Sequence, residues 1–217
     1  EEASTPSLND MISFVCKSEI LIPIMFIILF MSTPSYSDPF FYFLTNSLNF
    51  SATSLGKISF CSTVGVLIGI FIYKTYFKHA TFKNVIVVCT LISFIFSFCG
   101  YILVLRLNIK VGISDFWMVL MSNSLLSMIG EIMLLPLLSI ACILCPKNME
   151  GTIFSVFMSS LNFGSIVSNL FGSLLTSYFG ITSTNYDNLD CLILVSNIIS
   201  LLPLPLLYCL NEKYFKH

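Results

Sequence analysis

Long, continuous runs of apolar residues constrain this chain more than any other feature. The run VIVVCTLISFIFSFCGYILVL at residues 85–105 contains no charged residue, and a helix that crosses a bilayer needs about 20 such residues. Of the 217 residues, 56% are hydrophobic and 10% are charged, whereas soluble domains carry about a quarter charged residues. Because the runs are continuous rather than alternating, they favour helices over a membrane barrel. We therefore expect an all-α integral membrane protein.

Apolar runs of this kind predict a bundle of transmembrane helices over residues 20–210. The expected six spans cover residues 20–48, 52–77, 85–105, 116–144, 151–179 and 189–210. Residues 1–19 would then form a polar linker, and residues 211–217 a short tail. Since the chain opens with EEASTPSLND rather than with Met, we interpret it as a segment of a longer polypeptide or as a mature product.

The distribution of basic residues predicts the orientation of the bundle. If both termini lie on one side, seven lysines fall on that side: Lys17, Lys74, Lys78, Lys83, Lys147, Lys213 and Lys216. The opposite side receives Arg106 and Lys110, and Lys57 lies within a span. Because cytoplasmic segments carry the excess of Lys and Arg, both termini are expected to be cytoplasmic.

The composition argues against several classes of function. A net charge of −1 argues against a nucleic-acid partner. The eight cysteines lie in or beside apolar runs, and the pair Cys142 and Cys145 has no second pair or nearby His to complete a metal site. The two histidines, His79 and His217, fall in predicted cytoplasmic segments, so no nucleophile–base pair is expected inside the bundle. We expect no metal, no cofactor and no enzymatic activity.

Three ionisable residues interrupt the spans. Asp38 lies in the first, Lys57 in the second and Glu131 in the fourth. An ionisable group at membrane depth normally faces the bundle interior or a water-filled cavity, so a cavity is favoured over a purely structural role. The third and sixth spans carry no such group through their cores, and we expect them to face lipid.

Uncharged polar residues follow helical spacing in two spans. Asn123, Ser127 and Glu131 share one face of the fourth span, and a face of the fifth carries Ser155, Ser159, Asn162 and Asn169. The Asn and Ser side chains are equally compatible with a cavity and with hydrogen bonds that hold neighbouring helices together.

Small residues predict where helices approach closely. Gly164, Ser168 and Gly172 form one such line in the fifth span, and Gly65 with Gly69 forms another in the second. The first span is interrupted by Pro34 and Pro39 on either side of Asp38. A break of this kind is either part of a transporter binding site or a simple kink.

Two stretches resemble the folate–biopterin transporter family, a branch of the major facilitator superfamily. FFYFLTNSLNFSATSLGKI at 40–58 is similar to the family's aromatic, Thr-Asn and Leu-Gly pattern. CPKNMEGTIFSVFMSSLNFGS at 145–165 resembles its Cys-Pro, Glu-Gly-Thr, Met-Ser and Asn-x-Gly-Ser signature, and Asp187–Leu189 matches a later Asp-Asn-Leu. The resemblance extends from Phe40 to the end of the chain and is strongest at 145–165.

The resemblance implies a twelve-helix fold in two halves, of which this chain is the C-terminal half. It implies proton-coupled transport of a small-molecule substrate, a folate or another pteridine, across a plasma membrane or a plastid-type organelle membrane. The expected partners are the lipid bilayer and an N-terminal six-helix half or a second copy of the chain. The alternatives are a facilitator for another small molecule and a six-helix channel that works as an oligomer.

These considerations give a candidate substrate cavity and a candidate gate. The cavity comprises Asp38, Asn46, Lys57, Asn123, Ser127, Glu131, Ser159, Asn162 and Asn169. Amides and Glu131 would bind the ring, Lys57 would bind a carboxylate tail and pair with Asp38 when the site is empty, and Glu131 would carry the proton. The cytoplasmic gate comprises Glu150, Gly151, Thr152, Lys74 and Lys78.

Overall fold

The computed structural model describes residues 13–77, 80–144 and 149–209, and these residues form helices and no strand. The helices are α2 (Ser18–Met31), α3 (Ser37–Tyr42) with the π-helical turn η1 (Phe43–Ser47), α4 (Ala52–Ile72) with the π-helical turn η2 (Tyr73–Phe77), α5 (Phe82–Val104), α6 (Leu107–Lys110), α7 (Asp115–Leu144), α8 (Glu150–Tyr178), α9 (Leu189–Ile199) and α10 (Leu206–Cys209).

Four helices within the described residues are long and apolar enough to cross a membrane: Ala52–Phe77, Phe82–Val104, Asp115–Ser139 and Gly151–Tyr178. The prediction of an all-helical membrane protein is confirmed at this level. The first and sixth predicted ranges contain shorter helices instead, α2 with α3 and α9 with α10.

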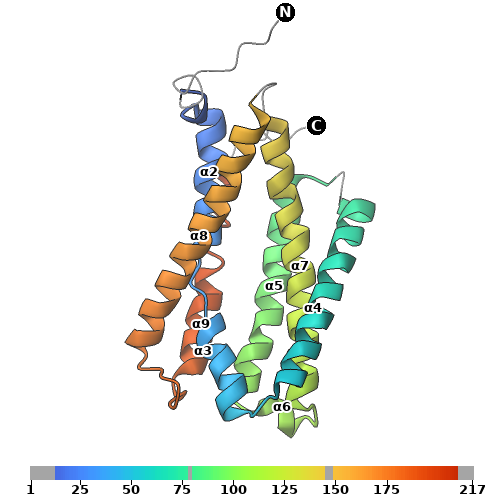
Figure 1. Ribbon diagram of the computed structural model, residues 1–217, viewed down its shortest axis with the longest axis vertical. Coiled ribbons are helices and arrows are strands. Elements are labelled where there is room, and N and C mark those ends of the chain that lie inside the picture. The colour runs from blue at the N-terminus through green and yellow to red at the C-terminus, as the bar shows by residue number, and fades with distance from the viewer. Residues whose placement is uncertain (1–12, 78–79, 145–148, 210–217) are drawn as a thin grey trace, which may run out of the picture.

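The helices run roughly along the long axis of the molecule (Figure 1). Helix α7 packs against α4 and α5, α2 packs against α8, and α5 also contacts α9. In Figure 1, α4, α5 and α7 lie on one side, and α2, α3, α8 and α9 lie on the other. The start of α2 and the start of α8 are at one end, and α6 is at the opposite end.

Local chemistry explains where the first span breaks. Pro34 follows the end of α2, because the residue before a proline is disfavoured in helical conformation. Pro39 lies in the first turn of α3, where the backbone N–H that proline lacks would have no helical partner. Helix α4 then begins with Ser51 as its cap, whose side chain accepts a hydrogen bond from the Ser54 backbone N–H at 3.2 Å.

Two glycines bring α4 against the backbone of α7. A Cβ atom placed on Gly65 would clash with the carbonyl oxygen of Ser124, and one on Gly69 would lie 2.6 Å from the carbonyl oxygen of Met128. The predicted close approach at Gly65 and Gly69 is therefore confirmed. Glu131 lies at the same contact, with its Cβ 3.3 Å from a Cβ placed on Gly69.

The small-residue line of α8 packs on the break between α2 and α3. A Cβ on Gly164 would lie 2.5 Å from the Cβ of Met31, and one on Gly172 would clash with the carbonyl oxygen of Ser35. Between these glycines the Ser168 hydroxyl donates to the carbonyl oxygen of Thr33. The Ser35 backbone N–H donates to the carbonyl oxygen of Ser168 at 3.2 Å. Helix α8 thus pairs two backbone groups that the break releases.

The third and sixth predicted spans, which we expected to face lipid, each have a buried side as well as an exposed one. Helix α5 buries Val85, Ile86, Cys89 and Thr90, and α9 buries Leu192, Ile193, Ser196 and Asn197. A helix without charged residues can still bury a polar side. The sequence did not indicate this side, because uncharged polar residues give no strong hydropathy signal. The opposite side of α5, which includes Ile95, is exposed.

Candidate functional site

A pocket of about 370 Å³ lies between α3, α8 and the segment after α8. We call it the α3–α8 pocket. It is lined by Ser35, Asp38, Pro39, Tyr42, Asn169, Gly172, Ser173, Thr176, Ser177, Ile181, Thr182, Ser183 and Tyr186. Its lining contains two residues that the sequence analysis placed in a cavity, Asp38 and Asn169.

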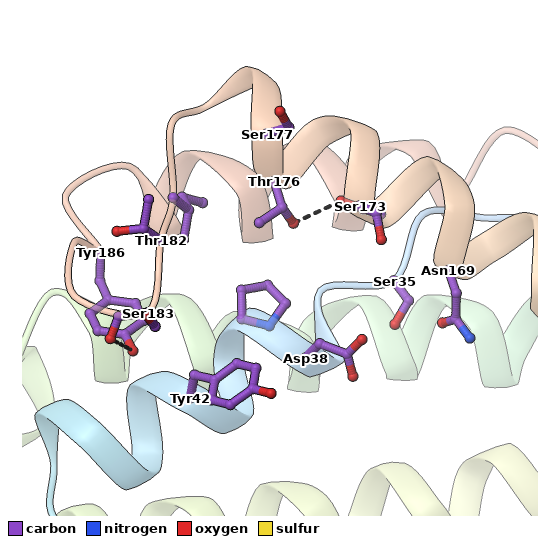
Figure 2. A pocket seen from close by; sticks show the side chains of 13 residues that line it. Ser35, Asp38, Tyr42, Asn169, Ser173, Thr176, Ser177, Thr182, Ser183 and Tyr186 are labelled. Carbon is purple, nitrogen blue, oxygen red and sulfur yellow. Dashed lines mark hydrogen bonds between the residues drawn. The ribbon is translucent and has the colours of Figure 1, made fainter.

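The two walls of the α3–α8 pocket carry complementary polar groups. Figure 2 shows Asp38 and Tyr42 on α3 opposite Asn169, Ser173 and Thr176 on α8. These α8 residues share a face because they recur at helical spacing. The Thr176 hydroxyl donates to the carbonyl oxygen of Gly172 at 2.7 Å. Within the described part of the chain, the Asp38 carboxylate and the Asn169 amide have no hydrogen-bond partner, so both can bind a ligand.

Asn46, another predicted cavity residue, forms hydrogen bonds that hold one end of the α3–α8 pocket together. Its Nδ2 donates to the carbonyl oxygen of Ser183 at 3.1 Å and to the hydroxyl of Tyr186 at 3.3 Å. The Tyr186 hydroxyl in turn donates to the Ser183 carbonyl oxygen at 2.8 Å, and its ring packs edge to face on Phe43. Asn46 therefore ties η1 to the segment that closes the pocket.

Other predicted polar residues of α8 lie along its exposed face. Ser155, Ser159 and Asn162 are exposed, as Asn169 is. Ser155 and Ser159 line a separate pocket of about 610 Å³ together with Gly151 and Thr152. The exposed polar face thus extends from the first turns of α8 to the α3–α8 pocket.

The predicted polar face of α7 points elsewhere. Asn123 lines a pocket of about 560 Å³ between α3, α4, α5 and α7, whereas Ser127 and Glu131 are half-buried. Glu131 lies against α4 at Gly69. The structure therefore does not bring Glu131 into the α3–α8 pocket with Asp38.

Lys57 is exposed on α4, and it does not pair with Asp38 as the sequence suggested. Asp38 lines the pocket on the α8 side of α3, whereas the neighbours of Lys57, Ile58 and Ser59, line the pocket on the other side. The ion pair observed among the described residues joins Arg106 and Asp115 at 2.9 Å.

Part of the predicted gate falls outside the described residues. Lys78 lies outside them, and of Glu150 the structure describes the backbone, as the first residue of α8. Lys74 is exposed in η2. The described residues contain no group of three or more His, Cys, Asp or Glu side chains able to hold a metal ion.

The sequence analysis missed a further polar cavity of about 420 Å³, which we call the α5–α9 cavity. Most of its polar lining comes from two spans that we had expected to face lipid: Thr90, Ser93 and Ser97 on α5, and Ser196, Asn197 and Ser200 at the end of α9. The signal was the cluster of uncharged polar residues in VSNIIS at 195–200. A search for charged residues within the spans does not find this cluster.

The comparison with known proteins identifies the family. A family model described as the BT1 family matches residues 2–216. The chain belongs to the BT1 family. In this BT1 chain, residues 40–58 include the second half of α3, η1 and the start of α4. Residues 145–165 include the first half of α8.

Relatives of this BT1 chain carry the names of transporters. It is 36% identical over 211 residues to the Folate-biopterin transporter of Synechocystis sp., covering 95% of this chain and 43% of the relative. It is 33% identical to Folate transporter 2 of Plasmodium falciparum, covering 96% and 46%, and 30% identical to Probable folate-biopterin transporter 4 of Arabidopsis thaliana, covering 87% and 38%. The chain thus spans less than half the length of these relatives. No solved structure matches it.

Proposed function

We propose that this BT1 chain supplies the C-terminal half of a membrane transporter for folates or other pteridines. In this proposal α2, α3 and η1 together form the first of six crossings, and α9 with α10 forms the sixth. The other half is an N-terminal six-helix unit, as in the major facilitator superfamily, or a second copy of the chain. Support comes from the names of the relatives and from a chain length below half of theirs.

The exposed polar face of α8 is the observation that carries the proposal. Ser159, Asn162 and Asn169 are exposed beside the exposed apolar side chains of Ile166 and Leu170. In lipid, unpaired amides and hydroxyls would be costly, because the bilayer core provides no hydrogen-bond partners. The face therefore suits a water-filled path that the other half closes.

The α3–α8 pocket offers the chemistry that a pteridine ring requires. A pteridine is flat and carries donors and acceptors along its edge. The Asp38 carboxylate can accept from two adjacent N–H groups, and the Asn169 amide can both donate and accept. Tyr42 and Tyr186 supply aromatic surface in the same lining.

The proposed orientation places both termini in the cytoplasm. Lys17, Lys74 and Lys83 lie at or near helix ends on the side where α2 and α8 begin, whereas Arg106 and Lys110 lie beside α6 at the other end. This distribution follows the excess of basic residues on cytoplasmic sides.

Uptake by whole cells tests the proposal. The full-length protein is expressed in cells that lack their own folate uptake, and the entry of labelled folate, biopterin, glucose and an amino acid is measured. We expect saturable uptake of the two pteridines and none of the other solutes. Uptake of a different solute in their place would show another facilitator, and non-saturable flux of many solutes would show a channel.

A second measurement tests the proposed half. Residues 1–217 are expressed alone and inserted in the same membrane, with insertion verified by protease protection. We expect no saturable pteridine uptake by a monomer of this segment, because a site between two halves requires both. Uptake that depends on a dimer of the segment would identify the second copy as the other half. Saturable uptake by a monomer of this segment would contradict the proposal of a missing half.

A further inference from the structure

The break in the first span separates two cavities. Ser35 and Asp38 line the α3–α8 pocket, whereas Thr33 and Pro34 line the α5–α9 cavity. The α5–α9 cavity has a volume of about 420 Å³, within the range of roughly 300–1,000 Å³ found for small-molecule sites. Its size therefore admits an organic ligand as well as water.

Two helix interruptions meet at this cavity. One is the break between α2 and α3, and the other is the non-helical stretch between the end of α9 at Ile199 and the start of α10 at Leu206. Ser200, directly after α9, also lines the cavity, and its hydroxyl donates to the carbonyl oxygen of Asn197 at 2.6 Å. Interrupted helices at membrane depth are tolerated where they line a cavity, and in transporters they mark binding sites.

Buried polar groups in the cavity wall lack partners. Ser196 is 3% exposed and Asn197 is 4% exposed. Among the described residues, neither the Ser196 Oγ nor the Asn197 Nδ2 has a hydrogen-bond partner. A buried polar atom without a partner is costly, roughly 1–3 kcal/mol, and both residues line the cavity. Both atoms are covered in this structure, so a molecule held in the cavity becomes their partner after a side-chain rotation that uncovers them.

The lining also indicates the charge of that molecule. No Asp, Glu, Lys, Arg or His is among the described residues that line the cavity. Hydroxyl-bearing residues such as Thr90 and Ser93 share the lining with the aromatic residues Tyr36 and Phe94. Burying a charged ligand here would leave it without a counter-charge. Hydroxyls, an amide and aromatic rings together suit a flat, uncharged, hydrogen-bonding heterocycle.

We propose that the α5–α9 cavity is a second binding site, separate from the α3–α8 pocket, for an uncharged pteridine ring. This inference rests on the proposed function for the substrate class. Asn197 and Ser196 bind the edge of the ring, and Tyr36 and Phe94 contact its faces. Residues of the break line both cavities, so the two sites share one backbone segment.

Equilibrium binding of biopterin tests the inference. The full-length protein in lipid nanodiscs is titrated with biopterin, and the number of moles bound is measured for the wild type, Asn197→Leu and Asp38→Asn. We expect Asn197→Leu to lose one mole of biopterin per chain, because the leucine fills the cavity and removes the amide. Asp38→Asn should retain that mole.

A milder variant and a control distinguish the loss of a binding site from misfolding of the protein. Ser196→Ala should raise the Kd of the Asn197-dependent site roughly three- to tenfold, as the loss of one hydrogen bond does. Ser139→Ala is the matched control, because its half-buried hydroxyl donates to Leu135 at 3.0 Å, away from the cavity. The thermal unfolding midpoint of each variant reports its folding.

The outcomes separate the inference from the proposed function. If the wild type binds biopterin and both Asn197→Leu and Ser196→Ala bind it equally well, the cavity holds water only and the inference is overturned. If Asn197→Leu and Asp38→Asn each abolish all binding, the two cavities are one site, and the proposal of a second site fails. If the wild type binds no pteridine at all, the proposed function fails as well.

Discussion

At the scale of single residues, the polar groups of the spans divide between ligand-facing and structural positions. Asp38 and Asn169 line the α3–α8 pocket without partners among the described residues, whereas Asn46 is held by Ser183 and Tyr186. Residue type alone does not separate Asn46 from Asn169. Their different roles follow from what each side chain can reach.

Asp38→Asn should weaken pteridine uptake without loss of folded protein. The substitution keeps the size of the side chain but removes the charge that accepts hydrogen bonds from the ring. Hydrogen bonds to charged groups contribute about 1.5–3 kcal/mol, so we expect kcat/KM for biopterin uptake to fall roughly 10- to 100-fold. Asp187→Asn, in the exposed segment after α8, is the matched control. Unchanged uptake by Asp38→Asn would remove Asp38 from the site.

Lys57→Gln should discriminate between substrates with and without a carboxylate tail. If exposed Lys57 binds the tail, the variant weakens uptake of folate about three- to tenfold more than uptake of biopterin, as a partly exposed charge pair would. Competition between labelled folate and unlabelled biopterin in the same cells gives the ratio. Lys110→Gln, at the end of the bundle, is the control. Equal effects on both substrates would mean that Lys57 does not bind the tail.

At the scale of elements, small residues determine which helices meet. Gly65 and Gly69 allow α4 to reach the backbone of α7, and Gly164, Ser168 and Gly172 allow α8 to reach the break. In a membrane this packing matters especially, since lipid provides little hydrophobic force to drive helices together. The break between α2 and α3 is therefore part of a packed and hydrogen-bonded contact with α8. It is not a kink that bends freely.

Gly65→Ala should destabilise the bundle, because the new methyl group would clash with the Ser124 carbonyl oxygen. Overpacking of this kind costs about 1–3 kcal/mol, which unfolding of the protein in mixed micelles can measure. Gly56→Ala lies on the same helix, and a Cβ there meets no atom within 4 Å. That variant should leave the free energy of unfolding unchanged or raise it. Equal effects of the two would contradict the close contact of α4 with α7.

At the scale of the whole molecule, transport requires groups that change their surroundings as access alternates. Glu131 is half-buried at the contact of α4 with α7, apart from the pocket that contains Asp38. It is therefore placed to respond to a shift of these two helices rather than to the ligand directly. The cytoplasmic gate expected at Glu150 stays a prediction.

Glu131→Gln should separate proton-driven uptake from exchange. If Glu131 carries the coupling proton, the variant cannot release it, and uptake driven by a pH gradient should fall at least tenfold. Exchange of external for internal folate at equal pH should remain within about twofold of the wild type, because no net proton movement is needed. Both rates are measured in proteoliposomes, with Glu19→Gln, near the start of α2, as the control. A parallel fall in both rates would assign Glu131 to structure or to substrate binding.

The sequence by itself determined that this chain is a helical membrane protein of a transporter-like family. The signals were local in the sequence: the long apolar runs, the prolines around Asp38 and the stretch at 145–165. Each can be interpreted without knowing the tertiary contacts, because hydropathy and backbone sterics depend on neighbouring residues. The face of α8 and the glycine lines were also predictable, because helical periodicity fixes which residues lie side by side.

The tertiary structure alone decided which faces meet. It placed Asn169 opposite Asp38, kept Lys57 and Glu131 out of that pocket, and brought Ser196 and Asn197 into one cavity with residues of the break in the first span. Hydropathy cannot predict these pairings, because an uncharged polar residue in an apolar run reads much the same whether it faces lipid or a cavity. The packing of small residues against backbone sets the rotation of each helix, and that rotation decides which polar groups share a cavity.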